Sequence, residues 1–218
     1  MLRKYLSSSI GKKQIVAVTG LWLILFLCFH LTLNMLIFLG PEAYNFFPEK
    51  AKETGLLLRF IEMGLASVFL IHIFFTFLVV IENFKASSNG YAVQNSWTDR
   101  SLATRLMPYT GTIILIFLLI HVCDFVIFHH NIDVSIYGPG MYGVVKYRLS
   151  QPLWAIGYMV VMFAVGSHLA HAIQSVFQSF GFYHSYYTPL IRKVSTVIGI
   201  TFAVLFCMIP ITFCWGLL

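Results

Sequence analysis

The chain has 218 residues, of which 59% are hydrophobic and only 10% are charged. A soluble domain of this size carries about a quarter charged residues, so the composition excludes an ordinary soluble domain and predicts a single membrane domain over residues 1–218. The formal net charge is +6. The positive residues cluster at the ends of apolar runs, which indicates membrane topology and not a nucleic-acid partner.

Five apolar runs are long enough to cross a bilayer, whose hydrocarbon core needs about 20 helical residues. Runs of this length exclude the short strands of a membrane barrel. The sequence therefore predicts an all-α bundle of five transmembrane helices, at about 14–39, 57–82, 108–129, 153–178 and 194–217. Pro152 suits the first turn of the fourth helix. We expect a polar loop at about 83–107 and an outer loop at about 131–151.

Lysine and arginine are unevenly divided between the two sides of this predicted bundle. The side that holds the N-terminus carries nine: Arg3, Lys4, Lys12, Lys13, Lys85, Arg100, Arg105, Arg192 and Lys193. The other side carries five: Lys50, Lys52, Arg59, Lys146 and Arg148. Because cytoplasmic loops have an excess of positive residues, we expect a cytoplasmic N-terminus in a multi-pass protein of the cell inner (cytoplasmic) membrane.

The cysteines give no sign of a metal site. Cys28, Cys123, Cys207 and Cys214 each lie inside an apolar run, and no two of them form a CxxC pair. Zinc and iron–sulfur sites usually need such spacings. We predict that all four are packing residues.

The histidines are more informative, because one lies deep in each of the first four predicted helices. They are His30, His72, His121 and His168. An ionisable side chain inside a bilayer costs at least a few kcal/mol, so four of them need a common explanation. With a rise of 1.5 Å per residue, His72 and His168 lie about 15 Å from the cytoplasmic helix ends, while His121 and His30 lie about 20 and 24 Å away.

These depths define two levels with two histidines each. A haem iron takes one axial ligand on each face, and imidazole is a common one. We therefore predict two haems, an inner one between His72 and His168 and an outer one between His30 and His121. The alternatives are hydrogen-bonded packing histidines, or a zinc site, whose ligands would converge on one point.

Four further histidines are assigned lesser roles. His171 lies three residues after His168 and is the rival ligand, but it sits a turn closer to the cytoplasm. We predict that it serves as a second-shell or haem-propionate group. His129, His130 and His184 fall at helix ends or in loops, where we expect solvated side chains.

A short repeat accompanies the deep histidines. The step Thr19-Gly20 is followed, after nine residues, by the histidine of the first helix. The step Thr110-Gly111 is followed, after the same interval, by the histidine of the third helix. Glycine at these positions predicts close approach of a neighbouring helix or of a flat cofactor.

The chain resembles the single-chain, two-haem cytochrome b subunits of succinate:quinone oxidoreductases, the family of succinate dehydrogenase and quinol:fumarate reductase. The matching stretches are TGLWLILFLCFHLTLN, RFIEMGLASVFLIH, RLMPYTGTIILIFLLIH and HLAHAIQSVFQSFG. They cover the first four helices, roughly 12–181, whereas the fifth matches only as an apolar span. The resemblance implies that His30, His72, His121 and His168 ligate two haems b.

The resemblance also implies partners. An iron–sulfur subunit with its clusters and a flavoprotein subunit with FAD would dock on the cytoplasmic face and carry the dicarboxylate chemistry, for which this chain has no catalytic residue. Electrons would pass between that iron–sulfur subunit and menaquinone or ubiquinone in the lipid bilayer, through the inner and then the outer haem. A dimer of such complexes is compatible with this reading. Two positions depart from the family: Gly166, where some relatives have a proton-carrying glutamate, and Ala172, where many have glycine.

Two acidic residues are candidates for exchanging protons with quinone. Asp124 lies one turn outward from His121 on a similar face. Glu62 lies near the outer end of the second helix, where the alternative is an interfacial pair with Arg59. A carboxylate beside a bound quinone can act as general acid or base.

Three polar residues are candidates for haem surroundings. Lys13 and Arg105 precede the two Thr-Gly steps and could face haem propionates or act as interfacial anchors. Asn34 lies four residues beyond His30 and is either a second-shell donor or a helix–helix contact.

Other functions stay open on sequence alone. The membrane subunit of a formate dehydrogenase or of a nickel–iron hydrogenase would also hold two haems. A haemless transporter or membrane anchor, in which the histidines bind protons or a metal, comes from a different class. An absorption spectrum separates the second alternative, and the co-purifying subunits separate the first.

Overall fold

The computed structural model describes residues 2–88, 102–127 and 136–217, which are helical with short turns and contain no strand. Five helices are long and apolar enough to cross a membrane. They are α2 (Ser9–Met35), α4 (Leu56–Ser88), α5 (Leu102–Val122), α7 (Pro152–Ser179) and α8 (Thr188–Cys214). The predicted all-α architecture with five spans is therefore confirmed.

Two spans change their helical geometry at the end that carries α3 and α6. A 3-10 turn, Leu36–Leu39, continues α2. A π-helical turn, Cys123–Ile127, continues α5 directly after the residues that carry His121. Single π turns occur mostly at functional sites, because they re-aim the side chains that follow.

Helix ends differ from the prediction by several residues. Helix α8 starts at Thr188 because Pro189 stands in its first turn, where proline needs no N–H partner. Pro152 plays the same part in α7, as predicted. Helix α4 runs on to Ser88 through polar residues, since a helix need not stop at the membrane surface.

Three short helices lie outside the spans: α1 (Leu2–Ser7), α3 (Pro41–Glu53) and α6 (Gly140–Leu149). Helix α6 falls in the stretch predicted as an outer loop, so that prediction is wrong for residues 140–149. Hydropathy could not reveal α6, because its mixed side chains are stabilised by packing against α3 and α7.

Asn45 joins α3 to the start of α6. Its side-chain amide donates to the Pro139 carbonyl at 2.9 Å, and its oxygen accepts from the Tyr142 N–H at 2.9 Å. Gly140 has φ +60° and leaves no room for a Cβ, which would lie 2.9 Å from the Asn45 amide. The buried Asn45 thus replaces backbone partners that this turn lacks.

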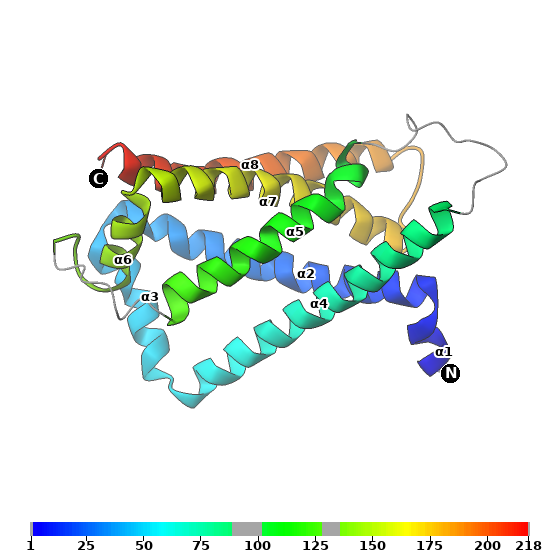
Figure 1. Cartoon of the computed structure of the whole chain (residues 1–218), viewed down its shortest axis with the longest axis horizontal. Helices are drawn as coiled ribbons and strands as arrows, with labels where there is room; N and C mark the ends of the chain where they lie inside the picture. Colours follow the sequence, from blue (N-terminus) through cyan, green and yellow to red (C-terminus); the bar gives the residue numbers. More distant parts are fainter. Residues whose placement is uncertain (1, 89–101, 128–135, 218) are drawn as a thin grey trace.

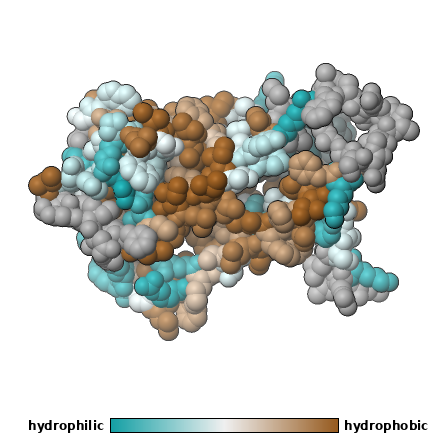
Figure 2. All heavy atoms as spheres, viewed as in Figure 1, coloured by the Kyte–Doolittle hydropathy of each residue, from teal (hydrophilic) through white to brown (hydrophobic). Residues whose placement is uncertain are grey.

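The helices alternate in direction, so the two ends of the bundle differ (Figure 1). The start of α2 and the ends of α4 and α7 lie at one end, and α3, α6 and the C-terminus lie at the other. Figure 2 shows an apolar band between more polar ends. The predicted division of the connections between two sides agrees with this arrangement; Arg100 lies outside the described residues.

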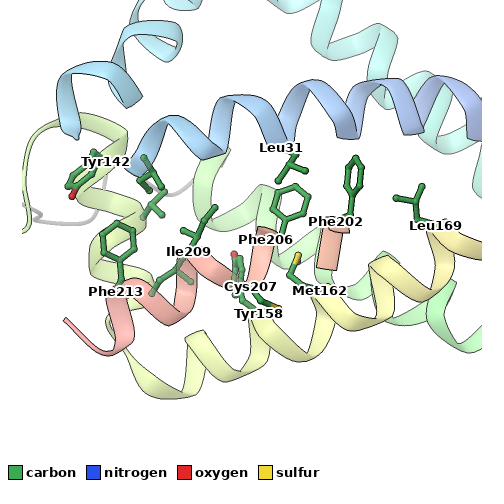
Figure 3. Packing of buried hydrophobic residues seen from close by; sticks show 13 residues of the cluster. Leu31, Tyr142, Tyr158, Met162, Leu169, Phe202, Phe206, Cys207, Ile209 and Phe213 are labelled. Atoms are coloured by element: carbon green, nitrogen blue, oxygen red, sulfur yellow. The ribbon is translucent and has the colours of Figure 1, made fainter. Parts of the chain in front are cut away.

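The core is formed mainly by α2, α7 and α8 (Figure 3). Phe202 and Phe206 of α8 lie among Leu31 of α2 and Met162 of α7. Helices α4 and α5 lie outside this core: α4 packs mainly on α2, and α5 packs mainly on α7. The four predicted histidine helices therefore form two neighbouring pairs, α2 with α4 and α5 with α7.

Helices α7 and α8 approach each other through two glycines. A Cβ on Gly166 would lie 2.5 Å from the Gly199 carbonyl oxygen, and a Cβ on Gly199 would likewise meet the Gly166 backbone. Small residues permit such close packing in membranes, where dispersion contacts hold helices together. Gly166 therefore faces α8, and α8 occupies the space that a glutamate at this position would need.

We expect Gly166→Leu to destabilise the bundle by about 1–3 kcal/mol or more, because the new side chain must push α7 and α8 apart. Unfolding in detergent, followed by circular dichroism, measures the loss. Gly157→Leu is the matched control, since a Cβ on Gly157 of the same helix meets nothing within 4 Å. Equal stability of the two variants would contradict this account of the α7–α8 contact.

Candidate metal centre

The outer histidine pair is brought together by α2 and α5. The ring centres of His30 and His121 lie 5.9 Å apart, with planes inclined at 85°. A transition metal binds an imidazole nitrogen at about 2.0 Å, so two imidazoles on opposite sides of one metal have ring centres about 6 Å apart. The separation of this pair therefore fits two ligands of a single iron.

Aromatic side chains surround the outer pair. Phe26 stacks on His30 at 5.5 Å, and Phe206 of α8 lies 6.1 Å from the same ring. Phe117 and Phe125 flank His121 at 5.4 and 5.1 Å. A shell of this kind lowers the local polarity and limits water, two factors by which a protein tunes a bound metal.

The inner pair comes from the other two helices. His72 of α4 and His168 of α7 lie close enough to interact electrostatically. The Thr19 hydroxyl of α2 lies 3.1 Å from His72 Nδ1, and the Thr110 hydroxyl of α5 lies 3.2 Å from His168 Nδ1. Each inner histidine is thus hydrogen-bonded to the neighbouring helix with which its own helix is paired.

The Thr-Gly repeat serves these inner histidines. A Cβ on Gly20 would lie 3.3 Å from His72 Cε1, and a Cβ on Gly111 would lie 3.4 Å from His168 Cε1. Each glycine therefore lets an imidazole of the adjacent helix rest against its backbone. The sequence predicted close approach at these steps, but it did not reveal that the approaching group is a histidine ring.

Sequence reasoning missed two residues near the outer pair. The Tyr158 hydroxyl of α7 lies 3.5 Å from His121 Nδ1, at the limit of a hydrogen bond. Arg148 of α6 pairs with Asp124 at 2.6 Å and places its guanidinium 4.5 Å from the centre of the Trp154 ring. Arg148 was counted only as a topology signal, because the helix that turns it inward was not predicted.

The Asp124–Arg148 pair is largely buried. Their side chains are 12% and 18% exposed, and Asp124 lies in the π-helical turn just beyond His121. Asp124 Oδ2 and Arg148 Nε have no hydrogen-bond partner among the described residues. Buried charges with unused hydrogen-bonding atoms are costly, and they are found mainly where a ligand or a proton is handled.

Glu62, the other predicted acid, has a different environment. It is partly exposed and pairs with Arg59 at 2.9 Å, three residues earlier on the same helix. This is the interfacial arrangement that the sequence left as the alternative. A surface pair of this kind contributes about 0–1 kcal/mol.

The predicted propionate candidates lie at the opposite end of the bundle. Lys13 is exposed, while its neighbour Lys12 turns inward and pairs with Glu82 of α4. Arg105 is half-buried at the start of its span. The structure thus adds Lys12 to the cations that lie near the inner level.

Asn34 contacts the backbone of the outer ligand and not its ring. Its amide donates to the His30 carbonyl at 2.8 Å, and its oxygen accepts from the Tyr44 hydroxyl at 3.3 Å. Burial raises the pKa of Tyr44, in α3, to about 12, so the hydroxyl keeps its proton and remains a donor. Asn34 therefore fixes the end of α2 against α3.

The other histidines differ from one another. His171 Nδ1 is buried and has no hydrogen-bond partner among the described residues. An unmet donor or acceptor one turn from His168 fits the predicted role toward a haem propionate. His184 is exposed, and its Nδ1 accepts from the Tyr186 N–H at 3.1 Å. His129 and His130 lie outside the described residues.

The donor set fits a haem better than a metal held by protein alone. Over residues 2–88, 102–127 and 136–217, no three His, Cys, Asp or Glu side chains converge on one point. A haem iron asks the protein for only two ligands, and two such histidine pairs are present. The chain matches no protein-family model, no curated protein and no solved structure.

We expect Arg148→Met to destabilise the protein by about 3–5 kcal/mol, because it leaves the Asp124 carboxylate buried without its partner. Thermal unfolding in detergent gives the comparison. Arg59→Met removes the exposed partner of Glu62 and should cost no more than about 1 kcal/mol. An Arg148→Met variant as stable as the Arg59→Met control would show that Asp124 does not depend on this pair.

Proposed function

We propose that this chain is the membrane anchor and electron-transfer subunit of a succinate dehydrogenase or fumarate reductase complex. In this proposal His72 and His168 hold an inner haem b, and His30 and His121 hold an outer haem b. The observation that carries it is the arrangement of four buried histidines as two pairs at two levels of one bundle. The resemblance of helices one to four to the dihaem subunits supplies the enzyme class.

A haem iron with two axial imidazoles supplies one-electron transfer when it is bound. The chain's own residues hold the ligands on separate helices and orient the inner rings through Thr19 and Thr110. The phenylalanines around His30 and His121 keep the outer level apolar. Electrons would then cross the bundle from one end to the other without a polar path through lipid.

The end that contains the start of α2 would be cytoplasmic. It carries the larger share of the lysines and arginines, which favours this orientation in the inner (cytoplasmic) membrane. Lys13, Arg192 and Lys193 belong to this end. We propose that it docks an iron–sulfur subunit, which in turn carries a flavoprotein subunit with FAD.

The quinone would react near the outer pair. Reduction of menaquinone or ubiquinone takes up two protons with two electrons, so a proton-exchanging group must be close to the reacting oxygen. Asp124 lies one turn beyond His121 and has an unpartnered carboxylate oxygen, and the Arg148 guanidinium holds its charge in place. Glu62 is the weaker candidate, because Arg59 already pairs with it at the surface.

Each of the four ligands can be tested in the same way. We expect His30→Ala, His72→Ala, His121→Ala or His168→Ala to lower the haem content from two per chain to one or none, since iron loses an axial bond. Pyridine haemochrome analysis of the purified complex measures this. His184→Ala, an exposed histidine, should keep both haems. Full haem content in all four ligand variants would refute the proposal.

The proton role of Asp124 has its own test. We expect Asp124→Asn to slow quinol turnover about 100-fold, because the amide keeps the shape but cannot exchange the proton. Haem content is measured alongside, so that loss of the fold is not read as loss of turnover. Glu62→Gln is the matched control and should retain most activity. Unchanged turnover in Asp124→Asn, with both haems bound, would exclude this carboxylate.

The identity of the complex is tested by what co-purifies. A flavoprotein with succinate or fumarate activity supports the proposal. A formate dehydrogenase or a nickel–iron hydrogenase as the partner would keep the two haems but change the enzyme class. A haemless chain that transports protons or a metal would contradict both.

A further inference from the structure

The two threonines that contact the inner histidines are placed by the same local pattern. Thr19 and Thr110 each stand one residue before the glycine on which the imidazole rests. Their hydroxyls lie 3.1 and 3.2 Å from the Nδ1 atoms of His72 and His168. Two independent copies of one contact, on different helix pairs, indicate a shared purpose.

The direction of these hydrogen bonds follows from the backbone. A hydroxyl has one proton to donate. The Thr19 oxygen lies 2.7 Å from the Ile15 carbonyl oxygen and 3.2 Å from that of Val16. Without a proton between them, oxygens at 2.7 Å would repel each other, so the hydroxyl proton points to the backbone. The threonine oxygen must then accept a hydrogen bond from Nδ1–H of His72.

The second copy has the same logic. The Thr110 oxygen lies 3.2 Å from the Leu106 carbonyl oxygen and 3.1 Å from that of Met107. Its proton is shared between these two acceptors, which leaves its lone pairs for Nδ1–H of His168. Both inner histidines therefore carry their proton on Nδ1, and the lone pair that can bind a metal is on Nε2.

The outer pair has no equivalent. The nearest group to His121 Nδ1 is the Tyr158 hydroxyl at 3.5 Å, a much weaker contact. Asn34, on the helix of His30, bonds the His30 carbonyl and leaves the ring alone. The threonine device is thus specific to the inner level.

We infer that Thr19 and Thr110 are positioning residues that set the tautomer of the inner ligands and tune the reduction potential of the inner haem. This inference rests on the proposed function. A hydrogen bond from the distal ring nitrogen raises the basicity of a metal-bound imidazole. A more basic ligand stabilises ferric over ferrous iron, so these hydroxyls lower the potential of the inner haem.

The test is a redox titration of the purified complex, followed optically, on paired variants. Thr19→Val and Thr110→Val keep the shape and remove the hydroxyl, whereas Thr19→Ser and Thr110→Ser keep the hydroxyl. We expect each valine variant to raise the midpoint potential of the inner haem and to leave the outer haem unchanged. We expect the serine variants to restore the original value.

Matched controls lie on the same helices. Thr112 and Thr32 make the same hydroxyl-to-carbonyl bond but are exposed. Thr112→Val and Thr32→Val should leave both potentials unchanged. If valine variants lose the inner haem while serine variants keep it, the hydrogen bond is still supported, because ligand orientation has failed.

Three results would overturn the inference. One is unchanged potentials in both valine variants with two haems bound. Another is equal loss of haem in the valine and serine variants, which would mean that only size and packing matter at these positions. The third is an equal potential shift in the exposed-threonine controls. A wild-type complex without haem would instead refute the proposed function, and the inference with it.

Discussion

The structure depends on how a bilayer treats imidazole. A polar ring in hydrocarbon is costly unless its nitrogens have partners, and each helix already uses its own backbone groups internally. The inner rings receive one partner each from a neighbouring helix, Thr19 for His72 and Thr110 for His168. That leaves one nitrogen per ring directed away from the hydroxyl. The pairing of α2 with α4 and of α5 with α7 follows from the same contacts.

Much of this arrangement could be predicted from the sequence, because it is encoded in residues that are rare inside a membrane. Hydropathy located the five spans, and counting 1.5 Å per residue sorted the histidines into two levels. The structure brings His30 beside His121, as that count implied. What the count could not provide is which face each helix turns to its neighbour. The threonine contacts, and the close approach of Gly166 to Gly199, therefore appeared only with the coordinates.

The outer level was harder to foresee, since its polar groups come from a helix without a hydropathy signal. Helix α6 holds Arg148 against Asp124, and the π-helical turn after His121 aims that carboxylate at the guanidinium. The two levels consequently differ in kind. The inner one is fixed by neutral hydroxyls on the spans themselves, whereas the outer one has an aromatic shell and a buried ion pair beside it. Such a division suits an inner site that only passes electrons and an outer site that also exchanges protons.

The central claim is that the four buried histidines hold two irons, each as part of a haem. The most direct measurement is the number of haems b per chain in the complex purified from membranes with its partners attached, read from the reduced-minus-oxidised absorption spectrum. The account predicts two haems for each copy of this chain, with the sharp bands of paired imidazole ligation. A colourless complex, or a spectrum without those bands, would contradict it.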